Sequence, residues 1–119
     1  MLTINLDQLD EETKKKIQNL TQLGQSLELL TQQKLQIDST IRETEIALEE
    51  LEKASPDTVV YKQVGGILVK SERNKLLDEK KSDKETLNMR SNTLAQKIER
   101  TKSTFENMQK SLQADLQNQ

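Results

Sequence analysis

The chain has 119 residues, of which 32% are hydrophobic and 32% charged, and its formal net charge is -2 with both signs interspersed. Tyr61 and Phe105 are its only aromatic residues, so it cannot fill a thick globular core. This charge pattern leaves no electrostatic footprint for nucleic acid. The absence of Cys and His removes thiol nucleophiles, disulfides, thiolate metal sites and the commonest general base. We therefore expect no enzyme, no cofactor and no metal site.

The N-terminal segment argues against export. It reads MLTINLDQLDEE, which is acidic where a signal peptide is basic, and no apolar run in the chain approaches a membrane-spanning length. We expect a soluble cytoplasmic protein that binds neither membranes nor nucleic acid.

The first half of the chain carries heptad periodicity. Its apolar positions are Leu6, Leu9, Leu20, Leu23, Leu27, Leu30, Ile37, Ile41, Leu48 and Leu51, and its polar ones are Thr13, Lys16, Lys34 and Thr44. Asn5 could cap the start, and Pro56 prevents the helix from continuing much beyond Ala54. The pattern predicts a helix over residues 6–54.

The segment TVVYKQVGGILVK, residues 58–70, predicts a β-hairpin whose two-residue turn is Gly65-Gly66. A primed turn needs positive φ at its centre, which glycine adopts without a Cβ penalty. A lone hairpin is unstable in water, and both faces of this one carry apolar side chains. We expect strands from other chains to complete the sheet, in preference to a hairpin folded back on its own helices, and we expect Lys62 and Lys70 to line a solvated edge. The residues assigned to this contact between subunits are Val59, Val60, Tyr61, Val64, Gly65, Gly66, Ile67, Leu68 and Val69.

A second helix is predicted over residues 72–117, with Ser71 as its N-cap. If the two helices pack antiparallel, facing residues should have position numbers with a constant sum. Leu48 with Leu77, Leu27 with Ile98 and Leu20 with Phe105 each sum to 125. Isolated helices this polar would be marginal, so burial of the shared seam is what stabilises them.

Polar residues interrupt the predicted seam. Lys34 faces Arg90 or Ser91, Thr44 faces Lys80 or Lys81, and Ile41 faces Asp83 or Lys84. Such positions either lie at the edge of the seam or fix register and partner choice; a second reading is that they make the helices flexible. We favour the interpretation that they lie at the edge of the seam or fix register and partner choice.

The order of long helix, single hairpin and long helix, with the stretches VYKQVGGILVK and RETEIALEELEK, resembles the archaeal-like β-type subunit of prefoldin, an ATP-independent co-chaperone. The resemblance implies one prefoldin-like domain over residues 1–119. Its fold class is mainly α: a long antiparallel two-helix coiled coil joined by one β-hairpin that assembles into a β-barrel between subunits. It further implies a hexamer of two α-type and four β-type subunits that captures unfolded proteins at the coiled-coil tips and transfers them to a group II chaperonin.

A chaperone of this kind needs accessible apolar surface at the helix ends farthest along the chain from the hairpin. The candidates for client binding are Leu6, Leu9, Ile17, Leu20, Phe105, Met108, Leu112 and Leu116. Phe105, Met108 and Leu20 could equally be ordinary seam residues, and the segment with Leu2 and Ile4 could simply be disordered. The competing hypothesis is a structural coiled-coil adaptor that joins partners through the hairpin and has no affinity for unfolded chains.

Overall fold

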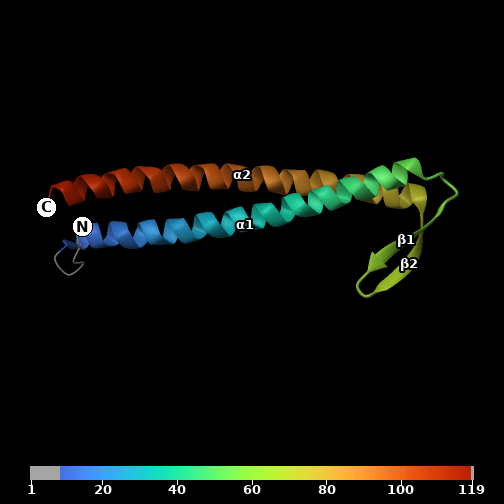
Figure 1. Ribbon diagram of the computed structural model, residues 1–119, viewed down its shortest axis with the longest axis horizontal. Coiled ribbons are helices and arrows are strands. Elements are labelled where there is room, and N and C mark those ends of the chain that lie inside the picture. The colour runs from blue at the N-terminus through green and yellow to red at the C-terminus, as the bar shows by residue number, and fades with distance from the viewer. Residues whose placement is uncertain (1–8, 119) are drawn as a thin grey trace. The chain divides into compact units, whose positions relative to one another are not determined.

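The computed structural model describes residues 9–118 and contains two long helices with a hairpin between them (Figure 1). In chain order the elements are α1 (Glu11–Lys53), β1 (Val59–Val64), β2 (Ile67–Glu72) and α2 (Arg73–Gln117). β1 and β2 form a two-stranded antiparallel sheet. The predicted fold class is confirmed: two long helices joined by one hairpin, in a class whose barrel forms between subunits.

The start of α1 is set by a side chain that the heptad pattern does not reveal. The Thr13 amide donates a hydrogen bond of 2.7 Å to Asp10 Oδ1, which makes Asp10 the N-cap, and Glu11 and Glu12 favour the positive end of the helix dipole. The helix therefore begins at Glu11, whereas the apolar pattern favoured Leu6. The cap expected at Asn5 lies outside the described residues.

The junction between hairpin and helices depends on Arg73. Its Nε donates to the Leu51 carbonyl at 2.7 Å and its Nη2 to the Glu52 carbonyl at 3.2 Å. These bonds satisfy carbonyls at the end of α1 and place a positive charge at the negative end of its dipole. Ser71, expected to cap α2, instead lies in β2 and pairs with Val60, because β2 continues to Glu72.

The hairpin turn has a single residue with positive φ. Val64 pairs with Ile67, and between them Gly65 has φ of 59°. Positive φ at the first central residue alone is the pattern of a type II′ turn, in which Gly66 needs no special conformation. The predicted primed turn is confirmed.

The described residues form two compact units. The hairpin unit is Lys34–Thr93, and the terminal unit comprises the residues up to Gln33 and those from Leu94 onward. Each unit contains a stretch of both helices.

The buried apolar core of the described chain lies in the hairpin unit. Leu48, Leu51, Leu76 and Leu77 form one cluster, and Val60 of β1 packs against it. Leu48 and Leu77, a predicted facing pair, both belong to this cluster, as expected for antiparallel helices. Ile41 is also buried.

The interrupted part of the seam is hydrogen-bonded. Ser91 Oγ donates to Asp38 Oδ1 at 2.6 Å, and Lys34 Nζ donates to Asp38 Oδ2 at 2.7 Å. The hydrogen bond from Lys34, then that from Ser91, holds the pKa of Asp38 below its usual value. Buried Thr44 donates to the Thr40 carbonyl at 2.8 Å. Of these bonds, only the one between Ser91 and Asp38 joins the two helices, and it supports the reading in which polar seam positions specify register.

The turn generates a matched test. A Cβ added to Gly65 or to Gly66 would meet no atom within 4 Å, so only backbone conformation distinguishes the two sites. Gly65→Ala should weaken the hairpin by about 1 kcal/mol because it forces a Cβ into the left-handed region. Gly66→Ala should leave it unchanged or slightly more stable. Hydrogen exchange of the β1 and β2 amides measures both, and equal effects would contradict the type II′ assignment.

Candidate assembly and client-binding surfaces

The hairpin carries apolar side chains that the described chain leaves exposed. Within the strands only Val60 and Ser71 are partly covered. The exposed apolar residues are Val59, Tyr61, Val64, Ile67, Leu68 and Val69. We name these six the hairpin patch.

The strand pairing divides the hairpin into two faces. Val60 and Lys62 share a face with Val69 and Ser71, and this face turns toward the helices of the hairpin unit. Tyr61, on the other face, is 58% exposed, and Leu68 is 69% exposed. The sequence favoured a hairpin completed by strands from other chains over a hairpin folded back on its own helices. In the structure, one face of the hairpin is partly covered by the helices and the other face is open.

Lys62, which was expected to line a solvated edge, has a side chain that is 46% exposed but also makes a contact with α2. Its Nζ donates to Glu79 Oε2 of α2 at 2.8 Å. The hydrogen bond from Lys62 lowers the pKa of Glu79, and the bond to Glu79 raises the pKa of Lys62. Beside this ion pair is a hollow of about 430 Å³ lined by apolar Ala47, Leu51, Val60 and Leu76 and by polar groups of β1 and α2. Val60 and Lys62 together tie β1 to the helices.

The terminal unit contains the second candidate surface. Seven of the eight predicted client-binding residues are described, and all seven are half-buried: Leu9, Ile17, Leu20, Phe105, Met108, Leu112 and Leu116. Leu6 lies outside the described residues, as do Leu2 and Ile4. The chain therefore brings these seven side chains into one unit, with each of them partly open to solvent. We name them the end seam.

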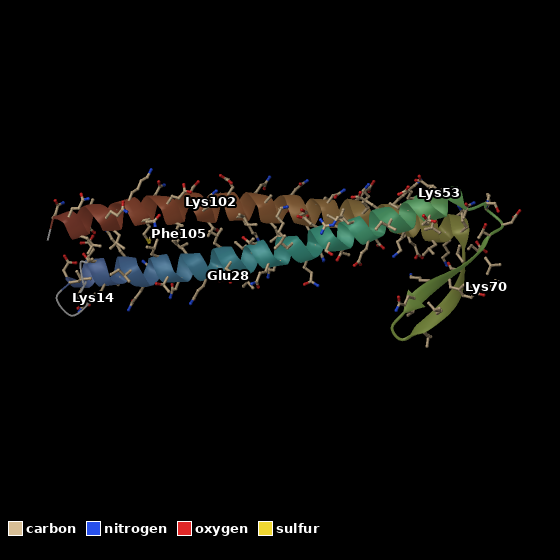
Figure 2. All side chains as sticks on the ribbon, viewed as in Figure 1. Lys14, Glu28, Lys53, Lys70, Lys102 and Phe105 are labelled. Atoms are coloured by element: carbon tan, nitrogen blue, oxygen red, sulfur yellow. The ribbon has the colours of Figure 1, made fainter. Side chains whose placement is uncertain are left out.

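Phe105 lies between the two helices of this unit (Figure 2). A Cβ added to Gly24 would lie 3.5 Å from Phe105 Cε2, which is ordinary van der Waals distance. The predicted partner of Phe105 was Leu20, one helical turn before Gly24. The ring thus lies in the seam, about one helical turn along α1 from its predicted partner.

Several polar contacts were missed by the sequence analysis. Lys16 Nζ donates to Ser111 Oγ at 2.9 Å and forms an ion pair with Asp115, so it joins α1 to α2 within the terminal unit. Asp38 and Glu79 make the contacts described above. The one available signal was a polar residue at a heptad position, which marks Lys16 and Lys34 but not their partners.

Other kinds of site find no support in the described residues. Between residues 9 and 118, no group of three or more His, Cys, Asp or Glu side chains is arranged to hold a metal ion. No helix in that range combines the length and apolarity needed to cross a bilayer.

Comparison with known proteins gives the family. The sequence model for the prefoldin subunit matches residues 5–119. The chain belongs to the prefoldin subunit family. Prefoldin subunit beta of Archaeoglobus fulgidus is 36% identical over 108 residues, covering 91% of this chain and 93% of that protein. Prefoldin subunit beta of Pyrococcus furiosus is 37% identical over 92 residues, covering 77% and 79%.

A solved structure shares the fold. The crystal structure of the prefoldin beta subunit from Thermococcus strain KS-1 matches with a TM-score of 0.80 and 30% identity, covering 88% of this chain and 92% of that one. The predicted resemblance to β-type prefoldin is confirmed. Prefoldins are a family of non-enzymatic chaperones, and membership implies assembly with other prefoldin subunits.

The ion pair between Lys62 and Glu79 generates a pH prediction. Because the folded pKa of Glu79 is lowered, its contribution to hairpin docking is present above its ordinary value near 4.5 and is lost as pH falls through the lowered value. The folded pKa of Lys62 is raised, so the contribution of Lys62 to hairpin docking is complete at pH values below its ordinary pKa near 10.5. That contribution is lost as the pH rises through the raised pKa.

Carboxyl NMR should find that the pKa of Glu79 lies below its ordinary range, and that Lys62→Gln returns this pKa toward that range. Lys70→Gln is the matched control and should leave the Glu79 titration unchanged. A Glu79 titration that does not respond to Lys62→Gln would contradict the ion pair.

Proposed function

We propose that this chain is the β-type subunit of a cytoplasmic hexamer with two α-type and four β-type prefoldin subunits. The hexamer is an ATP-independent holdase that captures unfolded proteins at the end seam and transfers them to a group II chaperonin. The observation that carries the proposal is the distribution of apolar surface. Within the described residues, apolar side chains are 44–69% exposed on a hairpin that forms a sheet of only two strands, and they are half-buried in the end seam.

The hairpin patch supports assembly. Full burial of one exposed Val, Leu or Ile side chain contributes about 1.5–3 kcal/mol. Because the six side chains are 44–69% exposed in this chain, burying what remains supplies on the order of 5–10 kcal/mol for each chain. Association costs about 4–15 kcal/mol in lost rigid-body freedom, which is within reach of that gain. A two-stranded sheet also has unpaired backbone groups along both outer edges, and strands from other subunits would satisfy them.

The end seam supports client capture. An unfolded chain presents varied apolar side chains, so its binding site must be accessible and adaptable. Met108 has three rotatable bonds and a polarizable sulfur, and Phe105 offers a broad ring face. Because these side chains are half-buried, a client gains only part of the full burial energy from each. Weak contacts of this kind allow release to a chaperonin without ATP.

Assembly through the hairpin can be tested on its open face. Tyr61→Lys with Leu68→Lys should abolish the hexamer formed with an archaeal two-hairpin subunit, because charged side chains cannot be buried there without partners. Native mass spectrometry measures the oligomer, and circular dichroism should remain largely helical. The matched control is Gln63→Lys with Lys70→Gln, which keeps the polar positions of the same face polar. An intact hexamer in the double lysine variant would refute barrel assembly.

Client capture can be tested on the end seam. Leu9→Ala with Leu116→Ala should leave the hexamer intact while weakening suppression of aggregation of a denatured model protein, since each truncation removes up to about 2 kcal/mol of contact. Leu29→Ala is the control, because Leu29 belongs to the same unit but is 55% exposed outside the end seam. If Leu29→Ala weakens suppression as much, the site assignment is wrong. If the unmodified hexamer suppresses nothing, the adaptor hypothesis is favoured.

A further inference from the structure

Lys16 occupies a seam position in the part of α1 that carries Ile17 and Leu20 of the end seam. The heptad pattern places it between Thr13 and Leu20. Its ammonium group crosses to α2, where it bonds to Ser111 Oγ at 2.9 Å and pairs with the Asp115 carboxylate. The side chains of Lys16 and Asp115 are 24% and 32% exposed. We name Lys16, Ser111 and Asp115 the end clasp.

The end clasp differs in kind from the apolar core of the hairpin unit. There, four leucines and Val60 pack together, and such apolar contact is non-directional and insensitive to charge screening. A partly exposed ion pair depends on geometry and weakens as salt rises. The hydrogen bond to Asp115 raises the pKa of Lys16, with further contributions from the charges of Glu12 and Asp10, so the lysine is charged at neutral pH.

Thr13, the other polar residue at a seam position in this region, also makes a hydrogen bond. Thr13 is 1% exposed, and its amide bonds to the Asp10 carboxylate. Two successive seam positions, Thr13 and Lys16, are therefore polar and hydrogen-bonded. The apolar members of the end seam flank them on both helices.

We propose that the end clasp controls access to the end seam, and so sets how readily this prefoldin takes up an unfolded chain. When Lys16 is paired with Ser111 and Asp115, the helix ends are held together and the apolar side chains are half-covered. When the pair separates, the helix ends part and those side chains become available to the client. This inference rests on the proposed client-binding function.

Substitutions at Lys16 should move the helix ends in opposite directions. Lys16→Glu places a carboxylate against Asp115 and should part the ends, whereas Lys16→Leu completes the apolar seam and should hold them together. Spin labels at Gln18→Cys and Asn107→Cys, both exposed positions of the terminal unit, report the separation by pulsed EPR. The chain contains no other cysteine. The experiment uses the full chain in its hexamer, with assembly verified by native mass spectrometry.

We expect a longer and broader distance distribution for Lys16→Glu, a narrower one for Lys16→Leu, and the original one when Lys16→Glu is combined with Asp115→Lys. Raising NaCl from about 0.05 M to about 1 M should broaden the distribution of the unmodified hexamer but not that of Lys16→Leu. Lys15→Glu and Lys15→Leu are the controls, because exposed Lys15 adjoins Lys16 and lies outside the end clasp.

Aggregation of the same denatured model protein supplies the functional readout. Lys16→Leu should raise the hexamer concentration needed for half suppression severalfold, and Lys16→Glu should lower it. Unchanged distances in Lys16→Glu, or changed distances with unchanged suppression, would overturn the control of access while leaving client capture intact. Failure of the unmodified hexamer to suppress aggregation would instead refute the proposed function, and the access role with it.

Discussion

Two helices packed side by side leave most apolar side chains of their shared seam partly open unless a third element lies against them. In the hairpin unit that element is β1, whose Val60 packs on the leucine cluster while Arg73 bonds to the last carbonyls of α1. Buried apolar side chains of the described chain are confined to this unit. In the terminal unit, the described end seam is formed mainly by its two helices, and its apolar side chains are only half-buried. The difference between a stable core and an accessible surface follows from this one constraint.

The polar seam residues of the two units have different surroundings. Asp38 is bonded by both Lys34 and Ser91 in the unit that also contains the buried core. A polar group at a seam position discriminates against other registers because a shift would leave it unpaired. Lys16 makes a similar bond from α1 to α2, but beside half-buried apolar residues. The same chemistry specifies alignment in one unit and, by our inference, access in the other.

The hairpin is shared between folding and assembly. One face contributes Val60 to the core and Lys62 to the ion pair with Glu79, which orients the strands on the helices. The other face keeps Tyr61 and Leu68 exposed. A hairpin fixed on one side presents its free face in a defined orientation, and this reduces the entropy lost when further strands join it.

The amino-acid sequence was enough to predict the element order, the primed glycine turn, the antiparallel pairing of the helices and the prefoldin family. Each of these depends on local periodicity or on short motifs, such as the stretch around Gly65 and the heptad positions of Leu48 and Leu77. The partners of polar side chains were decided only by the tertiary structure. Asp38 with Ser91, Lys62 with Glu79 and Lys16 with Asp115 join residues far apart in the chain, and no spacing rule encodes such contacts. Element ends also escaped the pattern, because apolar periodicity does not mark where a cap such as Asp10 or a strand end such as Glu72 lies. Which face of the hairpin is covered was likewise decided in three dimensions, since both faces are apolar and only packing against the helices distinguishes them.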